Sequence, residues 1–217
     1  ESYTREEMES MTRLMLVVGQ RTSSVAFEGL LMFMALYPEW QEKLYEEIKS
    51  LPDPIDFDTL HSLPLLHSVI WEDLRLTPPV PLQTRELIQD VTYEGTTYKA
   101  GTMLAYIHRQ AQRNPDLFPN PEEFDPGRFK MDGAMNKAEY GPQRFSPENP
   151  PLHTFSMPPH QCCGRVHALT AMKLAIVSIL KEAWIEPADA EEMRQIFHIG
   201  GFVLRHSAPI RVRFIPR

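Results

Sequence analysis

The two cysteines of the chain are adjacent, at Cys162 and Cys163. A thiolate is a nucleophile and a metal ligand, and it is stabilised at the N-terminus of a helix. We expect a helix to begin near Cys163, which would place Cys162 at its start, with His160 two residues earlier and able to meet an anionic group. Neighbouring cysteines rarely bond to each other, because a disulfide needs Cα atoms further apart than adjacent residues lie. The pair is therefore either a metal-ligating thiol with a bystander or two small buried side chains.

Two residues around the cysteines favour the ligand interpretation. Phe155 lies seven residues before Cys162 and can cover one side of the sulfur. Gly164 has no side chain, so a large planar group can approach the backbone there. The stretch FSMPPHQCCG thus has the residues expected of a thiol beside a flat cofactor.

A second group of chemically active residues is Glu72, Arg75 and Arg128. Glu72 and Arg75 share a helix face at a spacing of three, and most such pairs are weak surface ion pairs. The surrounding helix is strongly apolar, so this pair is a candidate for burial, which demands complete hydrogen bonding. Arg128 lies in NPEEFDPGRF between Phe124 and Phe129. It is either a charged loop residue or a second guanidinium on the carboxylate of Glu72.

The elements that position these residues are mainly helical. Apolar periodicity and the placement of proline predict helices and a β region, followed by a polar, proline-rich stretch over 108–153. The predicted helices are 1–36, 38–51 (solvated, on the outside), 57–61, 64–76 and about 163–184, with strands between 80 and 107 and around Gly200-Gly201 and Ser207-Pro209. The first helix is apolar on most faces, as in a helix buried inside a large protein. Within it, GQRTSS at 19–24 predicts a bend or groove, because Thr22 and its neighbours can bond back to the preceding turn.

Composition bounds the class of protein. The chain has 217 residues, 42% of them hydrophobic and 24% charged, as in a soluble globular domain. A formal charge of −7 gives no basic surface for nucleic acid. No apolar run reaches the roughly 18 residues of a membrane span. Because the first residue is Glu1 and not methionine, we expect a piece of a longer protein, whose missing part can hold a membrane anchor.

Four motifs, in this order along the chain, resemble those of the cytochrome P450 family, the haem-thiolate oxygenases. The cysteine motif F-x-x-G-x-[RH]-x-C-x-G is matched by Phe155, His160, Cys162 and Gly164, with Pro158 in place of the first glycine. The other matches are the E-x-x-R pair Glu72 and Arg75, the P-x-R-F loop Pro126, Arg128 and Phe129, and the central helix signature over 18–23. The resemblance covers residues 1–217 as the C-terminal, haem-binding half of the fold, without the N-terminal half. It implies an α+β class, mainly α with small β-sheets, containing the long central helix, the E-x-x-R helix, the cysteine loop and the helix after it.

The resemblance implies a role for each site residue. Cys162 would ligate the iron of haem b (iron protoporphyrin IX), with Phe155 and Gly164 beside it, and Cys163 would only pack. Arg85 and His160 would bind the haem propionates. Glu72, Arg75 and Arg128 would be structural, and Thr22 would be the catalytic residue of the central helix. Positions 16–22, 79–82 and 201–202 would face the substrate.

Two departures from the family pattern stand out. Arg21 occupies the position of the acid that precedes Thr22, and a permanent cation cannot relay a proton. Pro158 removes a backbone N–H beneath the sulfur.

The resemblance implies a monooxygenase, of eukaryotic microsomal type, that oxidises a small lipophilic substrate. It would use dioxygen and electrons from an NADPH-dependent reductase, and the full-length protein would lie at the endoplasmic reticulum membrane. Two alternatives remain. One is a haem-thiolate isomerase or dehydratase that needs no external electrons, which Arg21 favours. The other is a truncated relative that binds haem without catalysis.

Overall fold

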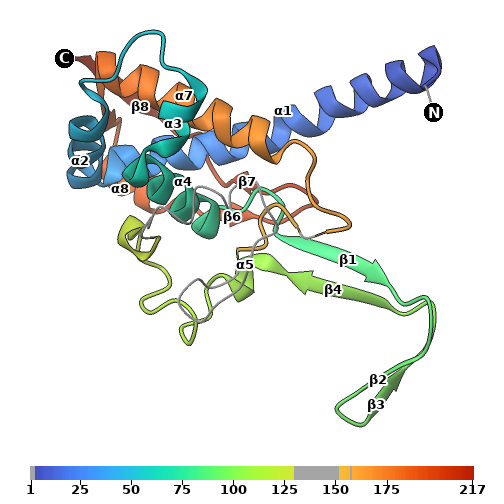
Figure 1. The fold of residues 1–217 in the computed structure, drawn as a ribbon. Helices are drawn as coiled ribbons and strands as arrows, with labels where there is room; N and C mark the ends of the chain where they lie inside the picture. Colours follow the sequence, from blue (N-terminus) through green and yellow to red (C-terminus); the bar gives the residue numbers. More distant parts are fainter. Residues whose placement is uncertain (1–2, 130–151, 157) are drawn as a thin grey trace.

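The computed structural model describes residues 3–129, 152–156 and 158–217. Helices make up most of its regular secondary structure and its sheets are small, so the predicted α+β class is confirmed (Figure 1). The helical elements are α1 (Arg5–Leu36), α2 (Pro38–Ile48), α3 (Phe57–Ser62), α4 (Pro64–Leu76), α5 (His108–Ala111), the 3-10 turn η1 (Pro126–Arg128), α7 (Arg165–Glu182) and α8 (Ala190–Arg194). None of the helices in these described ranges is both long and apolar enough to cross a membrane.

Helix α1 is the longest element and is buried over only part of its length. It starts with a capping box, in which the Thr4 side chain accepts from the Glu7 backbone and the Glu7 carboxylate accepts from Thr4. It runs without interruption through Gly19, where the sequence predicted a bend. Its buried residues begin at Val25, and the turns before them extend away from the rest of the protein (Figure 1). The predicted burial of the whole helix is therefore wrong for its first half, because no described segment packs over it.

The hydrophobic core lies where the second half of α1 meets α2, α4 and α7. Aromatic rings extend it toward the loop before η1, where Phe33 of α1 stacks on Phe124 with ring centroids 4.4 Å apart. Gln41 of α2 is fully buried. Its amide donates to the carbonyls of Met34 and Ile185, at 2.9 Å each, and accepts from the Ile185 backbone at 2.7 Å. Although α2 was predicted to lie in solvent, this face of it is part of the core.

All the described sheets are antiparallel strand pairs. The pairs are β1 (Leu82–Glu86) with β4 (Met103–Ile107), β2 (Val91–Tyr93) with β3 (Thr96–Tyr98), β5 (Ala183–Pro187) with β8 (Val212–Pro216), and β6 (His198–Ile199) with β7 (Arg205–His206). The β2–β3 hairpin turns at Glu94 and Gly95, both with positive φ.

The helix after the cysteines is shorter than predicted at both ends. It begins at Arg165, with Gly164 as its N-cap, where the sequence predicted Cys163. It ends at Glu182, because the next residues pair with the final strand: Trp184 lies opposite Ile215 in the β5–β8 ladder. Both cysteines therefore belong to the loop that leads into α7.

Candidate functional site

The loop before α7 folds back on itself between Phe155 and Cys162. The backbone N–H of Cys162 donates to the carbonyl of Phe155 at 2.9 Å, which closes the loop. The Phe155 ring is half-buried and meets Trp71 of α4 edge to face, with ring centroids 6.1 Å apart. Phe155 thus anchors the loop to the helix that carries the E-x-x-R pair, and it fixes where Cys162 lies.

The thiol of Cys162 is free and exposed. The surrounding protein still partly desolvates it, and this raises its pKa, against the smaller opposite effect of the Gly164 N–H. Because α7 begins three residues later, the helix start offers the thiol only the N–H of Gly164, and burial outweighs the predicted stabilisation of the thiolate. Cys163 is also exposed, so the prediction that it only packs is wrong.

Arg85 lies on β1 and reaches the cysteine loop. Its guanidinium Nη2 is 3.4 Å from the hydroxyl of Ser156, which itself donates to the side chain of Gln83 at 2.8 Å. This contact joins β1 to the residue that follows Phe155. Both Arg85 and His160 are exposed, so a cation from the sheet and an imidazole from the loop are available to an anionic ligand.

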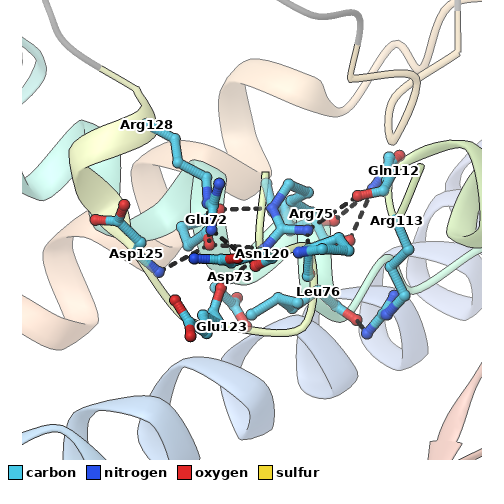
Figure 2. A network of polar contacts seen from close by, with 12 residues as sticks. Glu72, Asp73, Arg75, Leu76, Gln112, Arg113, Asn120, Glu123, Asp125 and Arg128 are labelled. Carbon is cyan, nitrogen blue, oxygen red and sulfur yellow. Dashed lines mark hydrogen bonds and ion pairs between the residues drawn. The ribbon is translucent and has the colours of Figure 1, made fainter. Parts of the chain in front are cut away.

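Glu72 and Arg75 of α4 form a fully buried ion pair, as Figure 2 shows. Arg75 Nε donates to Glu72 Oε2 at 2.7 Å and its Nη2 donates to Oε1 at 2.8 Å, so the pair is bidentate. Arg75 Nη1 donates to the carbonyls of Gln112 and Pro121, and Nη2 also donates to that of Glu123. All five N–H groups of the guanidinium thus have acceptors, which is what burial of this cation requires.

Arg128 joins the same carboxylate from η1. Its Nε is 3.3 Å from Glu72 Oε1, and its Nη2 donates to the Asn120 carbonyl at 2.9 Å. The backbone N–H of Asp125 also donates to Glu72 Oε1, at 2.9 Å. Of the two roles that the sequence left open for Arg128, the structure shows the second: one buried carboxylate holds two guanidiniums and the start of η1 (Figure 2).

Sequence reasoning missed two residues of this network. The Gln112 side chain is fully buried and donates to the carbonyls of Leu74 and Arg75, at 3.1 and 3.0 Å. Arg113 Nη2 donates to the carbonyl of Leu76 at 2.7 Å, which caps the C-terminus of α4. Both come from the polar stretch after β4, where neither periodicity nor spacing marks them.

Asp73, next to Glu72, is a buried carboxyl of another kind. It is fully buried, it accepts from the Thr77 hydroxyl at 2.6 Å, and it lies against Gly29 of α1. Burial raises its pKa well above the ordinary value, so the neutral acid is favoured. This acid belongs to the contact between α1 and α4.

On α1, Thr22 is half-buried and Arg21 is exposed. The Thr22 hydroxyl donates to the carbonyl of Val18 at 2.8 Å, the back-bond to the preceding turn that the sequence predicted. Its oxygen lone pairs remain available to accept a hydrogen bond. The described residues contain no group of three or more His, Cys, Asp or Glu side chains arranged to hold a metal ion.

A family model described as "Cytochrome P450" matches residues 1–214. The chain belongs to the cytochrome P450 family. Among curated P450 proteins, it is 30% identical to cytochrome P450 4c3 of Drosophila melanogaster, over 98% of this chain and 38% of that protein. It is 32% identical to leukotriene-B4 omega-hydroxylase 3 of Mus musculus, over 82% of this chain and 33% of that protein.

A solved P450 structure shows the same fold. The crystal structure of a cytochrome P450 (CYP102L1) superposes with a TM-score of 0.82 at 24% identity, covering 100% of this chain and 47% of that one. The chain thus spans one third to about one half of the P450 proteins compared with it. The motifs identified in the sequence therefore belong to one part of the P450 fold. The candidate site consists of the cysteine loop, the E-x-x-R network and helix α1.

Proposed function

We propose that this chain is the haem-binding part of a P450 monooxygenase, with Cys162 as the iron ligand. The observation that carries the proposal is the loop itself: an exposed, free thiol in a turn closed by the bond from Cys162 N–H to the Phe155 carbonyl. The buried Glu72 network supports it, because it fixes η1 against α4, and Phe155 packs on the same helix. Membership of the family supports a haem cofactor, and we take it to be haem b.

The residues present fit a haem. Its iron needs a soft, accessible ligand, which Cys162 offers, and its two carboxylates need cations at one edge. Arg85 and His160 would serve that edge, and Arg85 already contacts the cysteine loop through Ser156. The exposed apolar side chains of α1 would lie toward an apolar ligand, and these include Leu14, Leu16, Val17 and Val18.

Thiolate-ligated haem supplies the redox centre at which dioxygen is cleaved. This chain's own residues then have three tasks. Cys162 must be held in place, which the loop and Phe155 achieve. Thr22 on α1 must hold a proton near the substrate side. Its oxygen can accept one hydrogen bond while its hydroxyl donates to the carbonyl of Val18. Arg21 beside it is a permanent cation and cannot serve as the acid of a relay.

The partners follow from the same proposal. The substrate would be a small lipophilic molecule, dioxygen would be the oxidant, and an NADPH-dependent reductase would supply electrons. The full-length protein would lie at the endoplasmic reticulum membrane. The relative named as a hydroxylase, leukotriene-B4 omega-hydroxylase 3, supports the reaction class at 32% identity.

Arg21 favours a second candidate, a haem-thiolate isomerase or dehydratase that works without external electrons. Its guanidinium stands where the relay acid of a monooxygenase is expected, and it is exposed on α1. Turnover without a reductase would support this candidate and contradict the monooxygenase. If the monooxygenase is right, replacing Arg21 with aspartate should restore the relay acid and raise substrate oxidation coupled to electron use. No change in that oxidation would show that Arg21 does not impair a proton relay.

The test of the main proposal is spectroscopic. The purified protein is loaded with haem, reduced under carbon monoxide, and its Soret band is recorded. A thiolate ligand gives a band shifted to longer wavelength, and Cys162→Ser should abolish the shift while the matched Cys163→Ser keeps it. Loss of the shift in Cys163→Ser alone would show that the ligand is misassigned. Failure of the wild-type chain to take up haem would contradict both the monooxygenase and the haem-binding, non-catalytic relative.

A further inference from the structure

A group of basic side chains adjoins the Glu72 network, with which it shares Arg113. We call it the basic cluster, and it consists of Arg109 of α5, Arg113 just after α5, His198 of β6 and His206 of β7. His198 and His206 are opposite each other in the β6–β7 ladder, with ring centroids 4.9 Å apart. The two imidazoles and the two guanidiniums are all hydrogen-bond donors, and nothing in the proposed haem site uses them.

Several buried nitrogen atoms of the basic cluster, guanidinium donors among them, lack a hydrogen-bond partner. Within the described residues, Arg109 Nε, Arg113 Nη1, His198 Nε2 and both ring nitrogens of His206 have no hydrogen bond. The His206 side chain is only 3% exposed. A buried donor left unpaired costs about 1–3 kcal/mol, and native proteins contain few of them. Several in one place indicate that an acceptor binds there.

The backbone brings the two parts of the cluster to the same segment. The N–H of Leu204, just before β7, donates to the carbonyl of Pro79 at 2.8 Å. The N–H of Arg109 donates to the carbonyl of Pro81 at 3.2 Å. Because these carbonyls are two residues apart, α5 and the hairpin are held beside each other. In agreement, burial lowers the pKa of His198 to about 4, and the charges of His206, Arg109 and Arg113 add to the effect.

Nearby carboxylates do not balance the cluster fully. Glu122 pairs with Arg113, at 3.0 Å from its Nε. Glu28 of α1 is 3.8 Å from His206 Nδ1, but its side chain is 43% exposed. Burial lowers the pKa of His206, Glu28 opposes this shift, and Arg21 on the same helix adds to it. Within the described residues, Glu122 thus pairs with Arg113, Glu28 lies near His206, and no ion pair involves Arg109, which leaves the charge of Arg109 for a ligand.

We propose that the basic cluster binds an oxyanion and that its ligand carries a phosphate group. A tetrahedral oxyanion presents acceptors in several directions, which suits guanidinium and imidazole donors arriving from a helix and a hairpin. The phosphate is either free or the head group of an amphipathic molecule. Phe202, in the turn between β6 and β7, is 82% exposed and is an apolar surface for the tail of such a molecule. This proposal does not depend on haem.

The experiment is calorimetric titration of the 217-residue chain with inorganic phosphate, at an ionic strength held constant with chloride. Arg109→Gln and His198→Gln should each weaken binding about tenfold or more, because each removes a donor to a charged acceptor. The control Arg211→Gln changes an exposed arginine just before the last strand and should leave binding unchanged. Circular dichroism checks folding, and if Arg109→Gln unfolds, His198→Gln decides.

Absence of saturable phosphate binding to the wild type overturns the proposal. So does binding that survives both variants, or that weakens equally in Arg211→Gln. Hexyl phosphate and hexanol separate the two sources. Tighter binding of hexyl phosphate than of inorganic phosphate assigns the head group of an amphipath, and equal affinity assigns the free ion. Binding of hexanol without binding of either phosphate also overturns the oxyanion site.

Discussion

Replacing Glu72 with glutamine keeps the shape of the side chain and removes the charge at the centre of the buried network. The carboxylate now accepts from Arg75 at two nitrogens, from the Asp125 backbone and from Arg128. A glutamine has one acceptor oxygen, and its NH₂ group would face the guanidinium of Arg75, donor against donor. Arg75, at 0% exposure, would keep its charge without a counter-ion.

Breaking a buried ion pair in this way costs about 3–5 kcal/mol of the free energy of unfolding. For a chain of this length, each kcal/mol shifts the melting temperature by about 2–4 °C, so we expect a fall of roughly 6–20 °C. Thermal unfolding followed by far-UV circular dichroism measures it, with a urea titration as a second assay.

The matched control is Glu9→Gln, the same chemical change in an exposed ion pair with Arg5. Exposed pairs contribute little, so this variant should melt with the wild type. If Glu72→Gln also melts within about 2 °C of the wild type, a shift below about 1 kcal/mol, the charge of the network does not stabilise the fold. The argument from complete hydrogen bonding would then be refuted.

Two further predictions test the packing of α1 and the dependence of stability on pH. Gly29→Ala should lower the free energy of unfolding by about 1–3 kcal/mol, because the added methyl would lie 2.5 Å from the carboxyl of Asp73. At Gly19 an added methyl meets nothing within 4 Å, so Gly19→Ala should raise that free energy by about 0.5–1 kcal/mol. Chemical denaturation measures both. Burial lowers the pKa of His108 from 6.5 to about 4, so the neutral imidazole is favoured in the folded state. The resulting stability is complete above about pH 6.5 and is lost as the pH falls through 4. His108→Gln should therefore unfold with a weaker pH dependence across that window, and the exposed His167→Gln should match the wild type; equal slopes for both variants would contradict the burial argument.

Local patterns predicted most of the elements. Thr4 and Glu7 cap α1, Pro64 opens α4, and the prolines after Thr77 end it, because caps and proline act on the residues next to them. The helix after the cysteines was extended too far in both directions. At its C-terminal end the reason lies in long-range strand pairing, since β5 is a strand only because β8 lies beside it.

In the candidate site, too, some features follow from the local sequence and others only from long-range contacts. The sequence by itself determined which residues are able to carry the chemistry: Cys162 with Phe155, and Glu72 with Arg75, since those pairs follow from short spacings and side-chain chemistry. Only the tertiary structure decided that three backbone carbonyls and Arg128 complete the network. A guanidinium donates to any correctly placed oxygen. The segment that supplies those oxygens lies 37 to 48 residues further along the chain and leaves no local signal in the sequence. The unpaired nitrogens of the basic cluster were likewise visible only in the structure, because burial depends on the folded chain and cannot be inferred from residue spacing.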